Sequence, residues 1–141
     1  MKVLLAVDGS DYTQKMLDYL VKYDELLGRE DDYTVLSVEP VLPPRARGAL
    51  GKNIVDQYYS DEASRVLEPA VSFLRERGHL NVTKKFEVGQ PGETIARFAT
   101  DGEFDLIVMG SHGHGRILNL VMGSVTTAVL KHCHVPVLLV R

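Results

Sequence analysis

The sequence predicts a single-domain α/β fold, an open parallel five-stranded sheet with helices on both faces. Apolar runs of strand length alternate with helical patterns along the chain, as in proteins with parallel sheets. Residues 3–7 form a continuous apolar run, which is typical of a strand buried on both faces. The 141 residues are enough for one core and short for two, so one domain is expected over residues 1–141.

The first helix is predicted directly after this strand. Asp11 or Ser10 can cap it, its apolar residues recur at helical spacing, and Gly28 is placed to end it. Residues 33–38 are then predicted to form the second strand.

A loop and a long helix are expected next. Residues 40–53 hold three prolines and two glycines, which predicts a loop. Pro69 interrupts the helical pattern of residues 54–77, and a proline in a helix interior removes a hydrogen bond. We therefore expect either one bent helix or two helices end to end.

The second half of the chain supplies three more strands and two more helices. The third strand shows partial alternation, as at a sheet edge, and a proline can start the short helix after it. The predicted order is strand 82–88, a helix from Pro91, strand 105–109, helix 125–132 and strand 135–140.

The loop between strand 105–109 and helix 125–132 carries the strongest functional signal. Residues 110–124 contain four glycines, so the backbone there turns tightly or comes close to another group. Ser124 stands where the helix should begin; it can cap that helix, whose first N–H groups then point outward. A strand, a glycine-rich loop and a helix N-terminus bind phosphate in many proteins. Neither a Walker A sequence nor a dinucleotide G-x-G-x-x-G is present, and a tight connection is the alternative interpretation.

These residues resemble the universal stress protein family in its ATP-binding branch. The spacing Gly110-x2-Gly113-x9-Gly123-Ser124 matches the family's nucleotide-binding signature. The opening K-V-L-L-A-V-D-G-S and the closing H-V-P-V-L-L-V-R are similar to the family's first and last strands. The resemblance implies an adenine nucleotide alpha hydrolase-like fold with strand order 3-2-1-4-5, and a regulatory stress-response module that binds ATP with Mg²⁺ or Mn²⁺.

In that strand order, the direction of winding reverses between the first and fourth strands. Ligands of open parallel sheets bind beyond the carboxyl ends of the strands at such a reversal. Asp8 ends the first strand and Gly110 follows the fourth, so the two loops are expected to meet.

Each candidate binding residue has a proposed role. Gly110 and Gly113 would let the backbone approach a phosphate, while Gly123, Ser124 and Val125 would present N–H groups to it.

Four further residues are candidates, and three of them also have an alternative role. The resemblance places Asp8 at the adenosine end of the nucleotide, although a strand-end Asp can also cap a helix. It places Val38 and Met109 around the adenine, although both can be ordinary core residues. Arg116 lies in the loop and could pair with a phosphate oxygen.

Other partners and settings are not expected. The net charge is −3 with no basic block, which argues against nucleic acid as a partner. No apolar run approaches the roughly 20 residues that span a bilayer. A strand begins by Val3, which leaves no room for a signal peptide, and Cys133 is the single cysteine; both features are expected of a cytoplasmic protein.

Rival functions stay open at this point. The same pocket could serve a slow ATPase or a nucleotidyl-transferring enzyme, or could bind another adenine nucleotide. We find no positioned general base; Glu93 and Asp101 qualify only if the fold carries them to the site. Two His-x-His pairs suggest a metal, but they flank opposite ends of the last helix, roughly 10 to 15 Å apart at 1.5 Å per residue.

The last strand predicts a homodimer. Residues 135–140 are apolar at nearly every position and carry no charge. In the order 3-2-1-4-5 this strand lies at a sheet edge, where an unprotected apolar strand is a template for pairing. Antiparallel pairing of two such edges would be closed and self-complementary. A monomer with a covered edge is the alternative.

Overall fold

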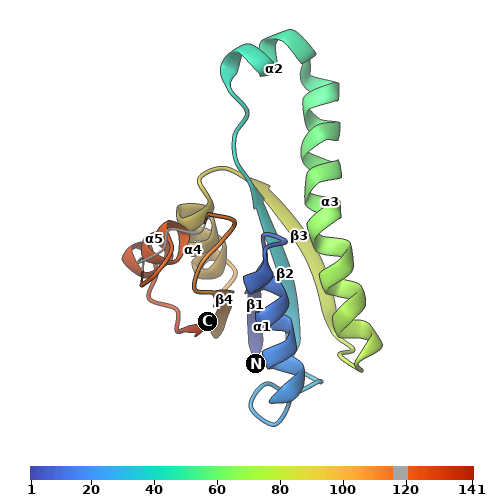
Figure 1. The fold of residues 1–141 in the computed structure, drawn as a ribbon, viewed down its shortest axis with the longest axis vertical. Helices are drawn as coiled ribbons and strands as arrows, with labels where there is room; N and C mark the ends of the chain where they lie inside the picture. The colour runs from blue at the N-terminus through green and yellow to red at the C-terminus, as the bar shows by residue number, and fades with distance from the viewer. Residues whose placement is uncertain (116–120) are drawn as a thin grey trace.

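The computed structural model describes residues 1–115 and 121–141, and its sheet is the predicted one. Five parallel strands lie in the order β3-β2-β1-β4-β5. Figure 1 shows helices covering both faces of this sheet. The strands are β1 (Lys2–Ala6), β2 (Asp32–Glu39), β3 (Val82–Val88), β4 (Leu106–Gly110) and β5 (Val137–Val140).

Two apolar layers hold the sheet between its helices. Alternate residues of the strands face α1 (Asp11–Lys22) and α3 (Lys52–Glu76) on one side. The other residues face α4 (Pro91–Asp101) and α5 (Ser124–His132). Leu5 and Leu4 of β1 illustrate the division, since each is fully buried but in a different layer. Because the central strands are buried on both faces, they read as continuous apolar runs.

The helix α1 ends earlier than predicted. It stops at Lys22, where the N–H of Tyr23 still bonds to the Tyr19 carbonyl, and not at Gly28. Gly28 belongs to the turn before β2, in which its N–H donates to the Asp31 carboxylate. Leu27 is buried although it lies outside the helix. Its apolar side chain continued the helical spacing in the sequence and made the predicted helix too long.

The expected loop 40–53 contains a short helix, α2 (Pro44–Leu50). Pro44 occupies its first turn, where the missing N–H is harmless, and Gly51 ends it with a φ of 79°. The following helix α3 runs without a break through Pro69, so the alternative of two helices end to end is wrong.

Residues 40–58 form a projecting arm. Figure 1 shows α2 and the first turns of α3 extending beyond the carboxyl ends of the strands. No residue of α2 is buried. The arm is tied back by Tyr59, which is buried and whose hydroxyl accepts the Leu42 N–H at 2.8 Å.

Candidate functional site

Asp8 follows β1 at the carboxyl edge of the sheet, and the turn into α1 fixes its carboxylate. One oxygen, Oδ1, accepts hydrogen bonds from the Ser10 N–H and from the Thr13 hydroxyl, each at 3.0 Å. The Asp8 N–H donates to the same hydroxyl at 3.1 Å. Ser10 is the N-cap of α1, so Asp8 organises the turn before the helix without being its cap. The second oxygen, Oδ2, faces the loop after β4.

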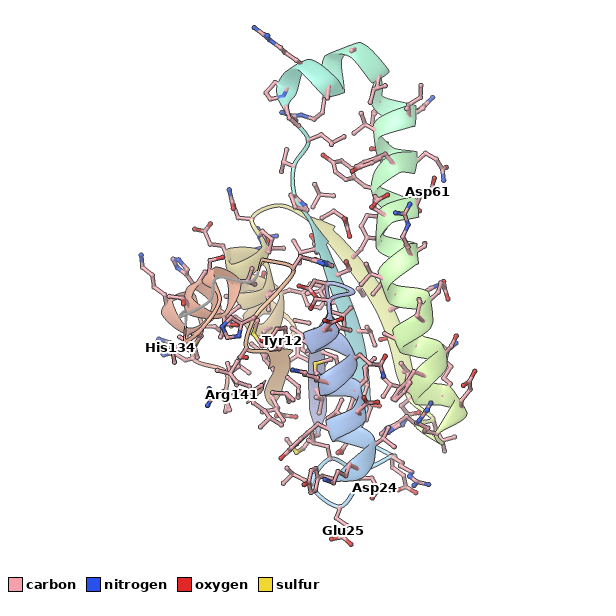
Figure 2. All side chains as sticks on the ribbon, in the orientation of Figure 1. Tyr12, Asp24, Glu25, Asp61, His134 and Arg141 are labelled. Carbon is pink, nitrogen blue, oxygen red and sulfur yellow. The ribbon has the colours of Figure 1, made fainter. Side chains whose placement is uncertain are left out.

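The loop after β4 lies directly against this turn. A Cβ placed on Gly113 would stand 2.8 Å from Asp8 Oδ2, so any other residue there would have to displace the carboxylate. Nε2 of His114 lies within hydrogen-bond distance of the Asp8 carbonyl oxygen. The rings of His112 and Tyr12 are also neighbours, with centroids 5.1 Å apart, and Figure 2 labels Tyr12 on α1. The structure therefore brings together the two loops that the topology predicted to meet.

The structure explains the glycine at position 110 by packing, and not by the predicted approach of a phosphate. It is the last residue of β4, opposite Val140. A Cβ there would lie 2.5 Å from the Cβ of Tyr12, so the glycine makes room for α1. The close approach at this position is thus between the strand and the helix.

The start of α5 also differs from the prediction. Gly123 is the N-cap, Ser124 is the first helical residue, and no side chain caps the helix. The Gly123 N–H already donates to the Ser111 carbonyl at 2.8 Å, so it is not a donor for a ligand. The N–H groups of Ser124 and Val125 belong to the first turn, where no carbonyl of the helix can accept them. Of the three N–H groups predicted to face a phosphate, these two remain as donors.

Thr126 connects α5 to the end of β4 and was not anticipated. Its side chain is 1% exposed, and its hydroxyl donates to the Gly110 carbonyl at 3.2 Å. The bond holds the helix N-terminus beside the carboxyl end of the strand.

Val38 and Met109 lie in the apolar layer beneath α4 and α5. Met109 is 5% exposed and pairs with Ala6 across the β1–β4 boundary. Val38 is partly buried near the end of β2. Both are core residues in the structure, and Val38 is the one with exposed surface at the carboxyl edge.

A cavity of about 160 Å³ opens where the two loops meet. It includes Gly113 but neither the first turn of α5 nor Val38. Arg116, a predicted phosphate partner, lies outside the described residues. The lining residues are Gly9, Ser10, Asp11, Tyr12, Gly113 and His114.

The groups considered for catalysis or metal binding are dispersed. Glu93 faces His132 at 3.8 Å, and Asp101 lies at the far end of α4 beside Lys2. Oγ of Ser111 lies 2.9 Å from Nδ1 of the neighbouring His112, and Ser111 is 3% exposed. Within residues 1–115 and 121–141, no three His, Cys, Asp or Glu side chains are grouped to hold a metal ion. No helix in those ranges is long and apolar enough to cross a membrane.

The fold and these loops define an α/β protein whose candidate site lies at the reversal point of a parallel sheet. The family model described as universal stress protein family matches residues 1–141. The chain belongs to the universal stress protein family.

Curated relatives are similar along nearly the whole chain. Universal stress protein Slr1230 of Synechocystis sp. is 35% identical over 140 residues, which are 99% of this chain and 42% of that protein. Universal stress protein MJ0531 of Methanocaldococcus jannaschii is 28% identical over 145 residues, 99% of this chain and 81% of that protein. The chain therefore spans less than half the length of the Synechocystis relative.

Solved structures share the fold. The structure of MJ0577 superposes with a TM-score of 0.80 at 27% identity, covering 99% of this chain and 94% of that one. A universal stress protein in complex with cAMP gives 0.69 at 20% identity, covering 99% and 95%. The Archaeoglobus fulgidus protein in complex with dAMP gives 0.67 at 24% identity, covering 100% and 98%.

Proposed function

We propose that this chain binds an adenine nucleotide, ATP in particular, between the loops that follow β1 and β4. The observation that carries the proposal is the packing of Gly113 against the oriented carboxylate of Asp8, beside the N-terminus of α5. Asp8 Oδ2 is an acceptor for hydroxyl or amino groups of the adenosine. The N–H groups of Ser124 and Val125 suit a phosphate. The cAMP and dAMP held by proteins of the same fold support adenine as the base.

Mg²⁺ or Mn²⁺ would accompany the phosphates. Such ions keep several waters and bind through one or two carboxylates plus phosphate oxygens, so they need no three-residue cage. Asp11 is the carboxylate that lines the cavity, so it is the residue proposed to hold such an ion. The activity that follows is that of a regulatory module in the cytoplasm, which responds to the nucleotide it holds.

Titration calorimetry of ATP with Gly113→Val and Gly115→Ala tests the site. The branched side chain at Gly113 would push against Asp8 and fill the space between the loops, so affinity should fall about tenfold or more. Gly115 is the matched control, since a Cβ there would meet nothing within 4 Å. As a control for folding, the circular dichroism spectra of the two variants should be alike.

Parallel titrations with AMP and cAMP identify which nucleotide the site prefers. If the first turn of α5 engages the outer phosphates, ATP should bind more tightly than AMP. Equal ATP affinity in the parent and in Gly113→Val would contradict the proposed site.

We also infer a homodimer through β5. Within residues 1–115 and 121–141, this strand pairs in the sheet with β4 alone. Its residues Val137, Leu138 and Leu139 keep exposed surface, although each also packs into the core. An apolar edge strand of this kind is able to pair with a second copy about a two-fold axis.

A further inference from the structure

A second and larger cavity, of about 370 Å³, lies far from the loops that carry the candidate nucleotide site. It is open between α4 and the part of the sheet formed by β2 and β3. The proposed nucleotide site lies at the carboxyl ends of β1 and β4, so β2 separates β3 from that site. Its volume is within the range of small-molecule sites, roughly 300 to 1,000 Å³.

The sheet beneath this cavity is polar where the rest of that face is apolar. Thr34, Lys85 and Glu87 line the floor. Strand register places them in line with Leu4, Leu36 and Val38 of the apolar layer, so their side chains share the face covered by α4. The layer beneath α4 thus changes from apolar to charged at β3, and a hollow is left there.

Cations exceed carboxylates around the hollow. Lys2, Lys85 and Arg97 contribute three positive charges, and Glu87 and Asp101 contribute two negative ones. Arg97 faces Glu87 across the hollow at 3.8 Å, a pair that is exposed and weak. Lys85 has no ion-pair partner among the described residues, so its ammonium is available to a bound anion.

One wall of the hollow is aromatic. The rings of Phe98 and Phe104 lie with centroids 5.8 Å apart and planes inclined by 30°. The Lys2 ammonium sits over the Phe104 ring, 4.8 Å from its centroid. The hollow therefore combines an apolar wall with cations at its rim.

We propose that this hollow binds a small organic acid, a carboxylate with a flat apolar body. The ring or unsaturated chain would lie along Phe98, and the carboxylate would pair with Lys85 and Arg97. An excess of one positive charge matches a monoanion better than a phosphate dianion. This second site is independent of nucleotide binding, since it shares no residue with the loops after β1 and β4.

Benzoate is the probe, followed in ¹H–¹⁵N correlation spectra of the full chain. It should shift the amides of Lys85, Phe98 and Gly102. The neutral analogue benzamide, which has the same ring, and inorganic phosphate, which has none, should each bind more weakly. Benzoate shifts confined to Gly113 and Ser124, or benzamide binding as well as benzoate does, would overturn the proposal.

Two neighbouring lysines give matched variants. Lys85→Met removes the unpaired ammonium and should weaken benzoate about tenfold, which is about 1.4 kcal/mol. Lys84→Met is the control, because Lys84 points to the opposite face of β3 and pairs with Glu68 of α3. Both variants should bind ATP as the parent does. Equal benzoate affinities in the two variants would contradict the assigned site even if ATP binding were confirmed.

Discussion

His79, in the turn between α3 and β3, is a titratable side chain that is 2% exposed. Its Nδ1 is buried and has no hydrogen-bond partner in the described part of the chain, and its ring meets Tyr33 edge-on with centroids 5.0 Å apart. Burial lowers the pKa of His79, the charge of Arg29 lowers this pKa further, and Asp24 opposes the shift. The folded protein therefore favours the neutral imidazole.

Acid should destabilise the fold through this residue. In the unfolded chain His79 takes up a proton near its ordinary pKa of about 6.5, whereas the folded chain resists it. Above that pH the contribution to stability is complete, and it is lost as the pH falls toward the lower folded pKa, by at most about 1.4 kcal/mol per pH unit. The free energy of unfolding, measured in urea at pH values from 7.5 down to about 5.5, should show this loss of stability. His79→Phe should flatten the dependence, while the exposed His134→Gln should leave it unchanged.

Some contacts of the candidate site could be predicted from the sequence, and others could not. The meeting of Asp8 with Gly113 followed from the reversal of the sheet and the glycine spacing. The hydrogen bond from the Gly123 N–H to the Ser111 carbonyl could not be predicted, because it depends on the path of the loop back to Ser111. Thr13 and Thr126 were missed too. Each is the third residue of its helix, is buried, and bonds toward the end of a strand. Neither helix has a capping hydrogen bond from the side chain of its N-cap, which is Ser10 in α1 and a glycine in α5.

The helices α4 and α5 pack closely against each other at Gly92. A Cβ on Gly92 would lie 2.3 Å from the Ala128 Cβ and 2.9 Å from the Val125 carbonyl oxygen. Val125 is in the first turn of α5, so this contact sets the position of the donors proposed for phosphate. We therefore expect α4 to influence the proposed site through this contact.

Gly92→Ala should displace α5 and weaken ATP binding about tenfold. Overpacking of this kind also destabilises a fold by roughly 1–3 kcal/mol. Gly48→Ala is the matched control, because a Cβ on Gly48 in helix α2 would meet nothing within 4 Å, and alanine favours helices. Calorimetry and thermal unfolding of both variants check this. An ATP affinity for Gly92→Ala equal to that for Gly48→Ala would show that the contact does not position the site.

The elements that could be predicted are those with a periodic apolar pattern. The strands appear within two residues of their expected bounds, since buried strands read as short apolar runs, and α4 begins at Pro91 as expected. The short helix α2 has no buried residue and therefore no such pattern. The prolines and glycines of residues 40–53 indicated a loop, although Pro44 stands in the first turn of α2 and Gly51 ends it.

For the whole molecule, the proposed dimer is tested by Leu138→Lys. A charge in β5 would meet its own copy across the two-fold axis, so the variant should sediment as a monomer and the parent as a dimer at micromolar concentration. Leu80→Lys is the control, since Leu80 is 77% exposed near the opposite edge of the sheet. A parent that sediments as a monomer would contradict pairing through β5.

The projecting arm has a consequence for the protein's susceptibility to proteases. Its Arg45, Arg47 and Lys52 are exposed, and few buried contacts would be lost if α2 opened. Trypsin should cut first between residues 45 and 52, and the fragments should co-elute, because the strands on either side remain paired within one sheet. Early cuts spread evenly over all lysines and arginines would mean that the arm opens only with the whole fold. Tyr59→Phe removes the bond to Leu42 and should speed the first cut, which would make the arm a unit that opens on its own while the rest stays folded.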